Sequence, residues 1–160
     1  MRILLALASL SGNTREVARV VTARCEEGGH TVDWIETDLQ TLAGQNVDPR
    51  TYTLFLFGTW TDNGGRTPFE MKRCIAELLE LIGKPACVAV FGTGETQWGH
   101  EYYCGAVHRI ADFFASRFPR LLIEQMPHGE RDVRAIVEWT DQVMNQCKTD
   151  SDADHYRYVA

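Results

Sequence analysis

Hydrophobic and polar positions along the chain form a repeating pattern, in which a short apolar run precedes a longer stretch with apolar residues at helical spacing. The apolar runs predict five strands, at residues 3–8, 31–35, 52–57, 86–91 and 121–123. The stretches with helical spacing predict four helices, around residues 17–25, 71–82, 103–114 and 133–147. Alternating strands and helices of these lengths are typical of right-handed β-α-β units. The pattern therefore predicts an α/β fold with a parallel sheet that is covered by helices on both faces.

The polar loop after the first strand has the composition of a phosphate-binding turn. Backbone N–H groups at the start of a helix lack partners within it and carry partial positive charge, so an anion binds there favourably. The hydroxyls of Ser9, Ser11 and Thr14 add donors, and Gly12 lets the backbone approach an anion closely. The loop contains no lysine and matches neither the Walker pattern nor Gly-x-Gly-x-x-Gly, so neutral donors must suffice. The alternative is that Ser11 or Asn13 only caps the helix.

Two further polar loops, at residues 58–65 and 92–99, also follow apolar strands. Ligands of a parallel sheet bind beyond the carboxyl ends of the strands, where the strand order reverses, and all three loops meet this description. The second and third loops each contain a tryptophan, Trp60 and Trp98. A phosphate site beside two aromatic loops predicts a ligand in which a flat ring is joined to a phosphate.

Length and composition limit the architecture. At 160 residues with 44% hydrophobic content, the chain is long enough for one well-packed core. We expect one domain over residues 1–148 and a polar tail over residues 149–160. The first apolar run is too short to span a bilayer and lacks the features of a signal peptide, so we expect a cytoplasmic protein with no membrane association.

The five cysteines and the net charge narrow the chemistry. The cysteines show no spacing that suits zinc and have mostly apolar neighbours, so we interpret them as small core residues in a reducing compartment. The formal charge of −6 argues against nucleic acid as a partner and favours docking onto basic protein surfaces. No acid–base pair or nucleophile–base pair is visible, so we predict neither catalytic residues nor a metal site.

Three motifs, in the same order along the chain, resemble those of flavodoxins. Residues 9–14 (SLSGNT) are similar to the flavodoxin phosphate loop, Thr/Ser-x-Thr/Ser-Gly-x-Thr. Residues 58–62 (GTWTD) resemble the second loop, and residues 92–96 (GTGET) with 101–107 (EYYCGAV) resemble the third loop and the helix after it. The resemblance covers residues 2–147 and implies a doubly wound five-stranded parallel sheet in the order 2-1-3-4-5, for which flavodoxin is the standard example. The last strand leads into the final helix without an inserted loop, as in the short-chain form.

The resemblance also implies a set of residues that bind flavin mononucleotide (FMN) non-covalently. The phosphate ligands that it implies are Ser9, Leu10, Ser11, Gly12, Asn13 and Thr14. The residues that it implies around the rest of the cofactor are Thr59, Trp60, Thr61, Asp62, Asn63, Gly64, Thr93, Gly94, Glu95, Trp98 and Tyr102. Of the two adjacent tyrosines, we expect Tyr103 in the core and Tyr102 at the margin of the site.

Trp60 matches the position that packs on one face of the flavin. Trp98 is the expected second stacking residue, because it stands four residues after Gly94, as the usual tyrosine does. Counted back from the helix that follows, the same position falls on His100, so the loop holds two inserted residues and the choice stays open. Glu95 stands where an aspartate is usual, and it either fixes the loop, adds negative charge near the pyrimidine end, or is simply solvated.

The resemblance implies one-electron transfer by FMN, and we predict a low-potential carrier that shuttles between the hydroquinone and the semiquinone. Residues 62–65 supply the backbone freedom that lets a carbonyl accept the proton gained by the semiquinone. Acidic surroundings, tryptophans against the ring and the lack of a local lysine disfavour the anionic hydroquinone. The implied partners are a flavodoxin reductase and other redox proteins that dock near the flavin edge, where Asp62, Glu95 and Glu101 attract a basic surface. We expect the carrier to be a monomer.

Three other functions stay open. One is an FMN enzyme on the same fold, such as an NAD(P)H-dependent reductase or the flavodoxin-like activator of manganese ribonucleotide reductase. A flavin-free receiver domain would need an acidic cluster after the first strand and an aspartate at the end of the third, where this chain has Ser9-Leu10-Ser11 and Gly58-Thr59. The last is an interaction module without a cofactor.

Overall fold

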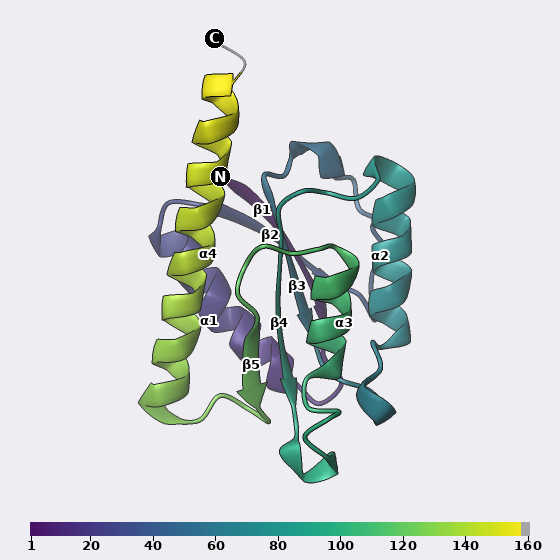
Figure 1. Cartoon of the computed structure of the whole chain (residues 1–160). Coiled ribbons are helices and arrows are strands. Elements are labelled where there is room, and N and C mark those ends of the chain that lie inside the picture. Colours follow the sequence, from purple (N-terminus) through teal and green to yellow (C-terminus); the bar gives the residue numbers. More distant parts are fainter. Residues whose placement is uncertain (158–160) are drawn as a thin grey trace.

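The structure is a computed structural model that describes the backbone of residues 1–157 and the side chains of residues 1–150. Its centre is a parallel sheet with the strand order β2-β1-β3-β4-β5 (Figure 1). The strands in the described chain are β1 (Arg2–Ala8), β2 (Thr31–Glu36), β3 (Leu54–Thr59), β4 (Val88–Gly94) and β5 (Leu121–Glu124). Its helices are α1 (Asn13–Glu27), α2 (Phe69–Ile82), α3 (Gly105–Phe113) and α4 (Gly129–Arg157), with short 3-10 turns η1 (Pro49–Thr51), η2 (Asn63–Gly65) and η3 (Thr96–Trp98). The predicted fold class and strand order are confirmed.

Alternate side chains of β1 point to opposite faces of the sheet, and both faces are buried. Ile3 and Leu5 belong to the core beneath α1 and α4, whereas Leu4 and Ala6 belong to the core beneath α2 and α3. A strand that is covered on both sides has no polar face to expose. This is why β1 is an unbroken apolar run in the sequence.

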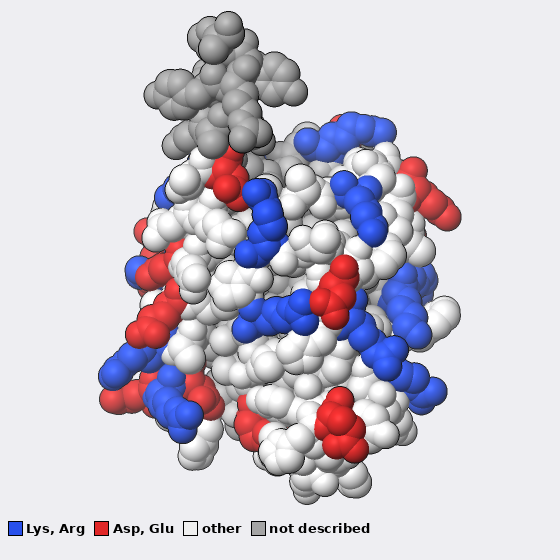
Figure 2. Space-filling view, viewed as in Figure 1, with Lys and Arg blue, Asp and Glu red and all other residues white. Residues whose placement is uncertain are grey.

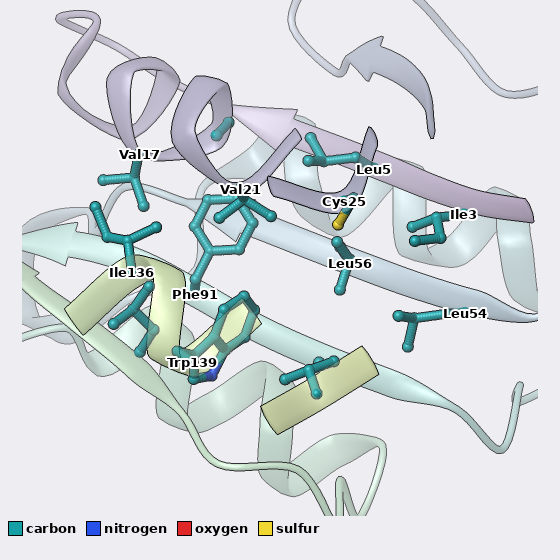
Figure 3. Packing of buried hydrophobic residues seen from close by; sticks show 14 of the residues in the cluster. Ile3, Leu5, Val17, Val21, Cys25, Leu54, Leu56, Phe91, Ile136 and Trp139 are labelled. Atoms are coloured by element: carbon teal, nitrogen blue, oxygen red, sulfur yellow. The ribbon is translucent and has the colours of Figure 1, made fainter. Parts of the chain in front are cut away.

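An aromatic pair lies in the core beneath α1 and α4. Beneath α1 and α4, Phe91 of β4 lies edge to face with Trp139, with ring centroids 5.7 Å apart, and Val21 and Ile136 surround the pair (Figure 3). The Trp139 indole N–H donates to the carbonyl of Pro119 at 2.7 Å, so its polar edge is satisfied. The sheet is therefore packed between two helical layers, and its loops extend from buried strands.

Some boundaries differ from those predicted. β3 begins at Leu54 and not at Tyr52. Tyr52 lies before the strand and donates its hydroxyl to Asp33 at 2.8 Å. The third helix begins at Gly105, since Cys104 has φ 48, a left-handed conformation that a right-handed helix does not contain. Tyr103, which we expected inside this helix, precedes it.

Helix α4 is longer than the sequence indicates. It runs from Gly129 to Arg157, so it passes through the expected boundary between residues 148 and 149, and residues 149–157 continue the helix. The rest of the expected tail, residues 158–160, lies outside the described residues. No helix within residues 1–157 is long and apolar enough to cross a membrane.

Candidate functional site

The three loops singled out in the sequence meet at the carboxyl ends of the strands, at the lower edge of the sheet in Figure 1. Together they line an open cleft of about 390 Å³, within the usual size range of small-ligand sites. Most of the predicted binding residues line it: Leu10, Ser11, Asn13, Trp60, Thr61, Asp62, Asn63, Gly64, Thr93, Gly94, Glu95, Trp98 and Tyr102.

The phosphate loop is held from behind by two of its own hydroxyls. Ser9 Oγ accepts the backbone N–H of Arg15 at 3.3 Å, and Thr14 Oγ1 lies 2.8 Å from Thr93 Oγ1, which ties the loop to β4. Both side chains are buried behind the cleft wall. Ser11 is the hydroxyl of this loop that lines the cleft.

The first turn of α1 points toward the cleft, and its N-cap residue makes no side-chain hydrogen bond. Its N-cap is Gly12, whose φ of 94 is a left-handed conformation that glycine adopts readily. Ser9, and neither Ser11 nor Asn13, supplies a side-chain oxygen to an N–H of this turn, so the alternative in which Ser11 or Asn13 only caps the helix does not describe the structure. The N–H groups of residues 10–14 are bonded to no other described residue. Such a helix start is suited to bind an anion.

A charged pair lies beside the phosphate loop. The Arg15 guanidinium donates to both carboxylate oxygens of Glu36, at 2.9 and 2.5 Å. This bidentate hydrogen bond raises the pKa of Arg15 and lowers the pKa of Glu36. Because each charge neutralises the other, the pair adds little net charge, and anion binding depends on neutral donors and the helix dipole.

The second loop is fixed through its tryptophan. The Trp60 indole N–H donates to Glu70 Oε1 on α2 at 2.9 Å, and the ring packs partly against the core beneath α2 and α3. Thr59 is fully buried, and its hydroxyl donates to the carbonyl of Trp60 at 2.7 Å. Thr59 thus shapes the loop from behind, and Trp60 presents an aromatic wall.

The tip of the second loop is a closed turn. Asp62 and Arg66 exchange two backbone hydrogen bonds, at 2.9 and 3.1 Å, and Gly64 and Gly65 between them have φ values of 70 and 74. A Cβ on Gly105 would lie 2.6 Å from the carbonyl oxygen of Gly65, so only glycine at 105 lets α3 approach the turn this closely. The turn is therefore anchored at its base and along one side.

Thr61 supplies a test of whether the cleft fits a polar cofactor. Its Oγ1 is buried and has no hydrogen-bond partner in the described structure, and the residue lines the cleft. A buried hydroxyl without a partner is costly, and one that lines a cleft can be satisfied by a bound molecule. The polar atom therefore fits a cofactor with hydrogen-bonding groups.

The third loop is folded around Glu95. The Glu95 carboxylate accepts the Trp98 indole N–H at 2.8 Å and also the side-chain amide of Gln97. Trp98 lines the cleft with 72% of its surface exposed, whereas His100 is exposed and is not among the lining residues. The structure thus brings Trp98, and not His100, to the cleft, and gives Glu95 the role of fixing the loop.

The two tyrosines separate as expected. Tyr102 lines the cleft and is 44% exposed, while Tyr103 packs against the core beneath α2 and α3, where burial raises the pKa of its hydroxyl.

Two lining residues were not predicted as ligands, Gly65 and Gln125. Gln125 follows β5 with φ 54, and its N–H donates to the carbonyl of Gly94 at 2.8 Å. Its position directly after the fifth strand could have indicated it, because the carboxyl ends of all strands in a parallel sheet lie at the same edge.

The cysteines offer no reactive thiol near the cleft. Cys104 is buried behind Gly94, and burial raises the pKa of its thiol to about 12, so it stays protonated. Burial also raises the pKa values of Cys25 and Cys74 to about 12. Within the described residues, no cluster of His, Cys, Asp and Glu has the arrangement of a metal site.

Comparison with known proteins decides the family. The flavodoxin family model matches residues 5–146, which is most of the chain. The chain belongs to the flavodoxin family. Probable flavodoxin 2 of Bacillus subtilis (strain 168) is 29% identical to this flavodoxin over 143 residues, which cover 84% of this chain and 89% of the relative.

Solved flavodoxin structures share the fold. Oxidised flavodoxin 2 from Bacillus cereus superimposes with a TM-score of 0.72 at 27% identity, over 91% of this chain and 99% of that one. A short-chain flavodoxin associated with a non-canonical PDU bacterial microcompartment gives a TM-score of 0.77 at 21% identity, over 92% and 99% of the two chains. The absence of an inserted loop after β5 agrees with the short-chain form.

Family membership confirms the predicted electron carrier that binds FMN. The protein is an electron carrier that binds FMN, and it is not an enzyme. This result decides among the alternatives that the sequence left open. The cleft suits the cofactor, because it combines neutral anion donors, two indoles and an unsatisfied buried hydroxyl.

Proposed function

We propose that the cleft described above is the FMN site and that the predicted binding residues hold the cofactor there, either by contact or by supporting the loops. The N–H groups of residues 10–14 and the Ser11 hydroxyl hold the phosphate, while Trp60 and Trp98 contact the flavin ring. The supporting observation is that an uncapped helix start and two indoles line the same cleft. Thr14, Ser9 and Thr59 act indirectly, by holding the loops in place.

FMN supplies the one-electron redox chemistry when it is bound. The chain sets the electrostatic environment. Asp62 and Glu95 line the cleft, and the Arg15 guanidinium beside it is neutralised by Glu36. Carboxylates near the cofactor oppose each added negative charge, and one kcal/mol of such opposition lowers a one-electron potential by about 43 mV. The proposed carrier therefore works at low potential, between its two more reduced states.

The backbone of the closed turn can change its conformation when a group in the cleft gains a proton. Glycine adopts positive and negative φ with similar ease, so the peptides on either side of Gly64 can rotate. The Asp62–Arg66 bridge and the contact between Gly65 and Gly105 hold the rest of the turn still. A backbone carbonyl can thus be offered to a protonated ring nitrogen by a local rotation alone.

Other parts of the proposal concern the whole chain. Redox proteins are the partners of a flavodoxin, and we infer that a flavodoxin reductase is one of them and docks near the flavin edge. The acidic groups there, Asp62, Glu95 and Glu101, favour a partner with a basic surface. We further propose that the protein is a cytoplasmic monomer that binds no nucleic acid, with residues 1–148 as its functional unit.

The unpartnered hydroxyl of Thr61 allows a sharp test with a matched control. Thr61→Val replaces the hydroxyl by a methyl group of similar size, and Thr22→Val does the same to another buried, unpartnered hydroxyl, on α1 away from the cleft. We expect Thr61→Val to weaken FMN binding about tenfold, because one hydrogen bond is lost. The Thr22→Val variant should bind FMN as tightly as the native chain.

Stability of the FMN-free protein completes this experiment. Removing a buried hydroxyl that has no partner should leave the free energy of unfolding unchanged or raise it by about 1 kcal/mol in both variants. Affinity is measured by quenching of flavin fluorescence and stability by urea unfolding. If Thr61→Val and Thr22→Val bind FMN equally well, the proposed site is wrong.

A further inference from the structure

A second hollow lies between α2 and α3, on the side of the molecule away from the phosphate loop. It has a volume of about 360 Å³ and an apolar floor that includes Ile75, Leu79, Ile110 and Phe113. The α2 residues at positions 72, 75, 76 and 79 follow helical spacing, so they form one stripe along the helix. We call this hollow the α2–α3 groove.

The groove leaves apolar surface uncovered. Phe113 is 44% exposed at the end of α3, and Ala76 is exposed on α2. Helix α3 has nine residues against fourteen in α2, so it is much the shorter wall of the groove. A contiguous apolar hollow with a polar rim is the usual form of a surface that binds another molecule.

The rim of the groove is basic. Lys72 and Arg109 line it, and neither side chain has a hydrogen-bond or ion-pair partner among the described residues. The amine of Lys84 lies 4.1 Å from the centroid of the Phe113 ring and donates to the Phe113 carbonyl at 2.6 Å. Figure 2 shows Lys and Arg side chains gathered over α2 and α3.

Two acidic side chains stand near the groove without lining it. Asp112, on α3, is engaged by Arg120, and Glu80, on α2, stands one turn beyond Ala76. Elsewhere on the protein, arginines such as Arg2 and Arg24 are paired with carboxylates. In a chain with a net charge of −6, the groove therefore has two cations at its rim that pair with no described carboxylate.

We propose that the α2–α3 groove docks an acidic amphipathic segment of a partner protein. A large apolar side chain of the segment enters the groove against Phe113, and its carboxylates pair with Lys72 and Arg109. The groove begins at Thr67, directly after the closed turn at residues 62–66, so the docked partner is held beside the cofactor cleft and leaves it open. This docking is independent of the redox chemistry and goes beyond it.

The test uses the full chain loaded with FMN and a synthetic amphipathic helical peptide that carries leucines on one face and glutamates beside them. Binding is followed through backbone amide chemical shifts. We expect shifts in α2 and α3 and none in α1, and we expect a matched peptide with lysines in place of the glutamates to bind at least about tenfold more weakly. A higher salt concentration should weaken binding of the acidic peptide.

Variants locate the site without disturbing the core. Lys72→Glu combined with Arg109→Glu should lower the affinity for the acidic peptide about tenfold. Ala76→Glu, at an exposed position inside the groove, should abolish binding, and Arg134→Glu, on the exposed face of α4, should leave it unchanged. FMN binding should be native in all of them, so failure of this proposal is distinguishable from failure of the FMN site.

Other occupants would overturn the proposal. Equal binding of the two peptides, equal binding of a DNA duplex, or an Ala76→Glu variant that binds normally would each show that the groove does not select an acidic protein segment. Sedimentation that reveals dimers in the native chain and monomers in Ala76→Glu would assign the groove to a second copy of this protein instead.

Discussion

Glu95 holds Trp98 at the mouth of the cleft. The indole is 72% exposed, so little packing fixes it, and its hydrogen bond to the Glu95 carboxylate at 2.8 Å is the main restraint. A hydrogen bond to a charged acceptor is stronger than one between neutral groups. One residue therefore combines two roles, since the same carboxylate also contributes negative charge to the cleft.

Two substitutions separate these roles. Glu95→Ala removes both the restraint and the charge, and we expect FMN to dissociate several-fold faster. Glu95→Gln keeps an acceptor for the indole but removes the charge, so the affinity should stay closer to native while the potential of the second electron step rises by a few tens of mV. Stopped-flow dissociation and redox titration measure the two effects. Identical behaviour of the two variants would contradict the division of roles.

Individual site residues were predictable to the extent that a motif fixed their position. The phosphate loop and both tryptophans were found in the sequence, and all reach the cleft or its wall. The outward or inward direction of a hydroxyl was not predictable, because the partners of Ser9 and Thr14 come from α1 and β4. Gln125 was missed because no motif accompanies it.

The Arg15–Glu36 pair joins the start of α1 to the end of β2. The hydrogen bond from Arg15 lowers the pKa of Glu36 below its ordinary value of 4.5. A lowered pKa in the folded state means that the stabilisation is complete above pH 4.5 and is lost as the pH falls through the lower, folded value.

We expect Glu36→Gln to lower the free energy of unfolding at neutral pH by about 1 kcal/mol, since the pair is partly buried and bidentate. The difference between variant and native chain should shrink as the pH falls below 4.5. Urea unfolding across this range measures it, and a difference that is independent of pH would show that the pair is not the cause.

The contact between α3 and the closed turn is a second junction between elements. A Cβ at position 105 meets backbone atoms of Gly65, which cannot move aside as a flexible side chain can. Gly105→Ala should therefore displace the turn and weaken FMN binding at least about tenfold, because misplaced ligand groups are costly.

Gly44→Ala is the control for this substitution, because its new Cβ would be crowded only by the Thr41 hydroxyl, and would make ordinary contact with the Thr41 carbonyl oxygen at 3.6 Å, outside the cleft. Calorimetric titration with FMN compares the two. Native affinity in Gly105→Ala would show that the turn does not need this close approach.

Strands and helices followed from the sequence more reliably than their ends. Buried strands are continuous apolar runs, and their order followed once the flavodoxin motifs were recognised. The start of α3 was misjudged because the left-handed conformation of Cys104 leaves no mark in the hydrophobic pattern. The length of α4 was misjudged because residues 149–157 are polar, and polar residues are compatible with both helix and tail.

Charge is distributed unevenly over the whole molecule. Carboxylates stand at the cleft, with Asp62 and Glu95 in its lining, whereas cations gather over α2 and α3. The acidic cleft and the basic α2–α3 groove therefore favour different partners. A basic redox protein is attracted to the cleft, and an acidic segment is attracted to the α2–α3 groove.

Reduction of cytochrome c, a basic one-electron acceptor, by the reduced protein tests whether the carboxylates at the cleft attract a basic partner. We expect the rate to fall several-fold as ionic strength rises through the physiological range, because steering charges are screened. Glu101→Gln should slow the reaction at low salt, and Glu80→Gln, on α2, should not. A rate that does not respond to salt would exclude electrostatic docking at the cleft.

The most direct measurement of the whole account is a titration of the FMN-free protein with FMN and, separately, with riboflavin, which lacks the phosphate. Flavin fluorescence is the readout. We expect FMN to be quenched to completion at one equivalent per chain, and riboflavin to bind about a hundredfold more weakly, since the N–H groups at the start of α1 then lose their anion. Equal affinity for the two flavins, or fluorescence that is not quenched by the protein, would contradict the account.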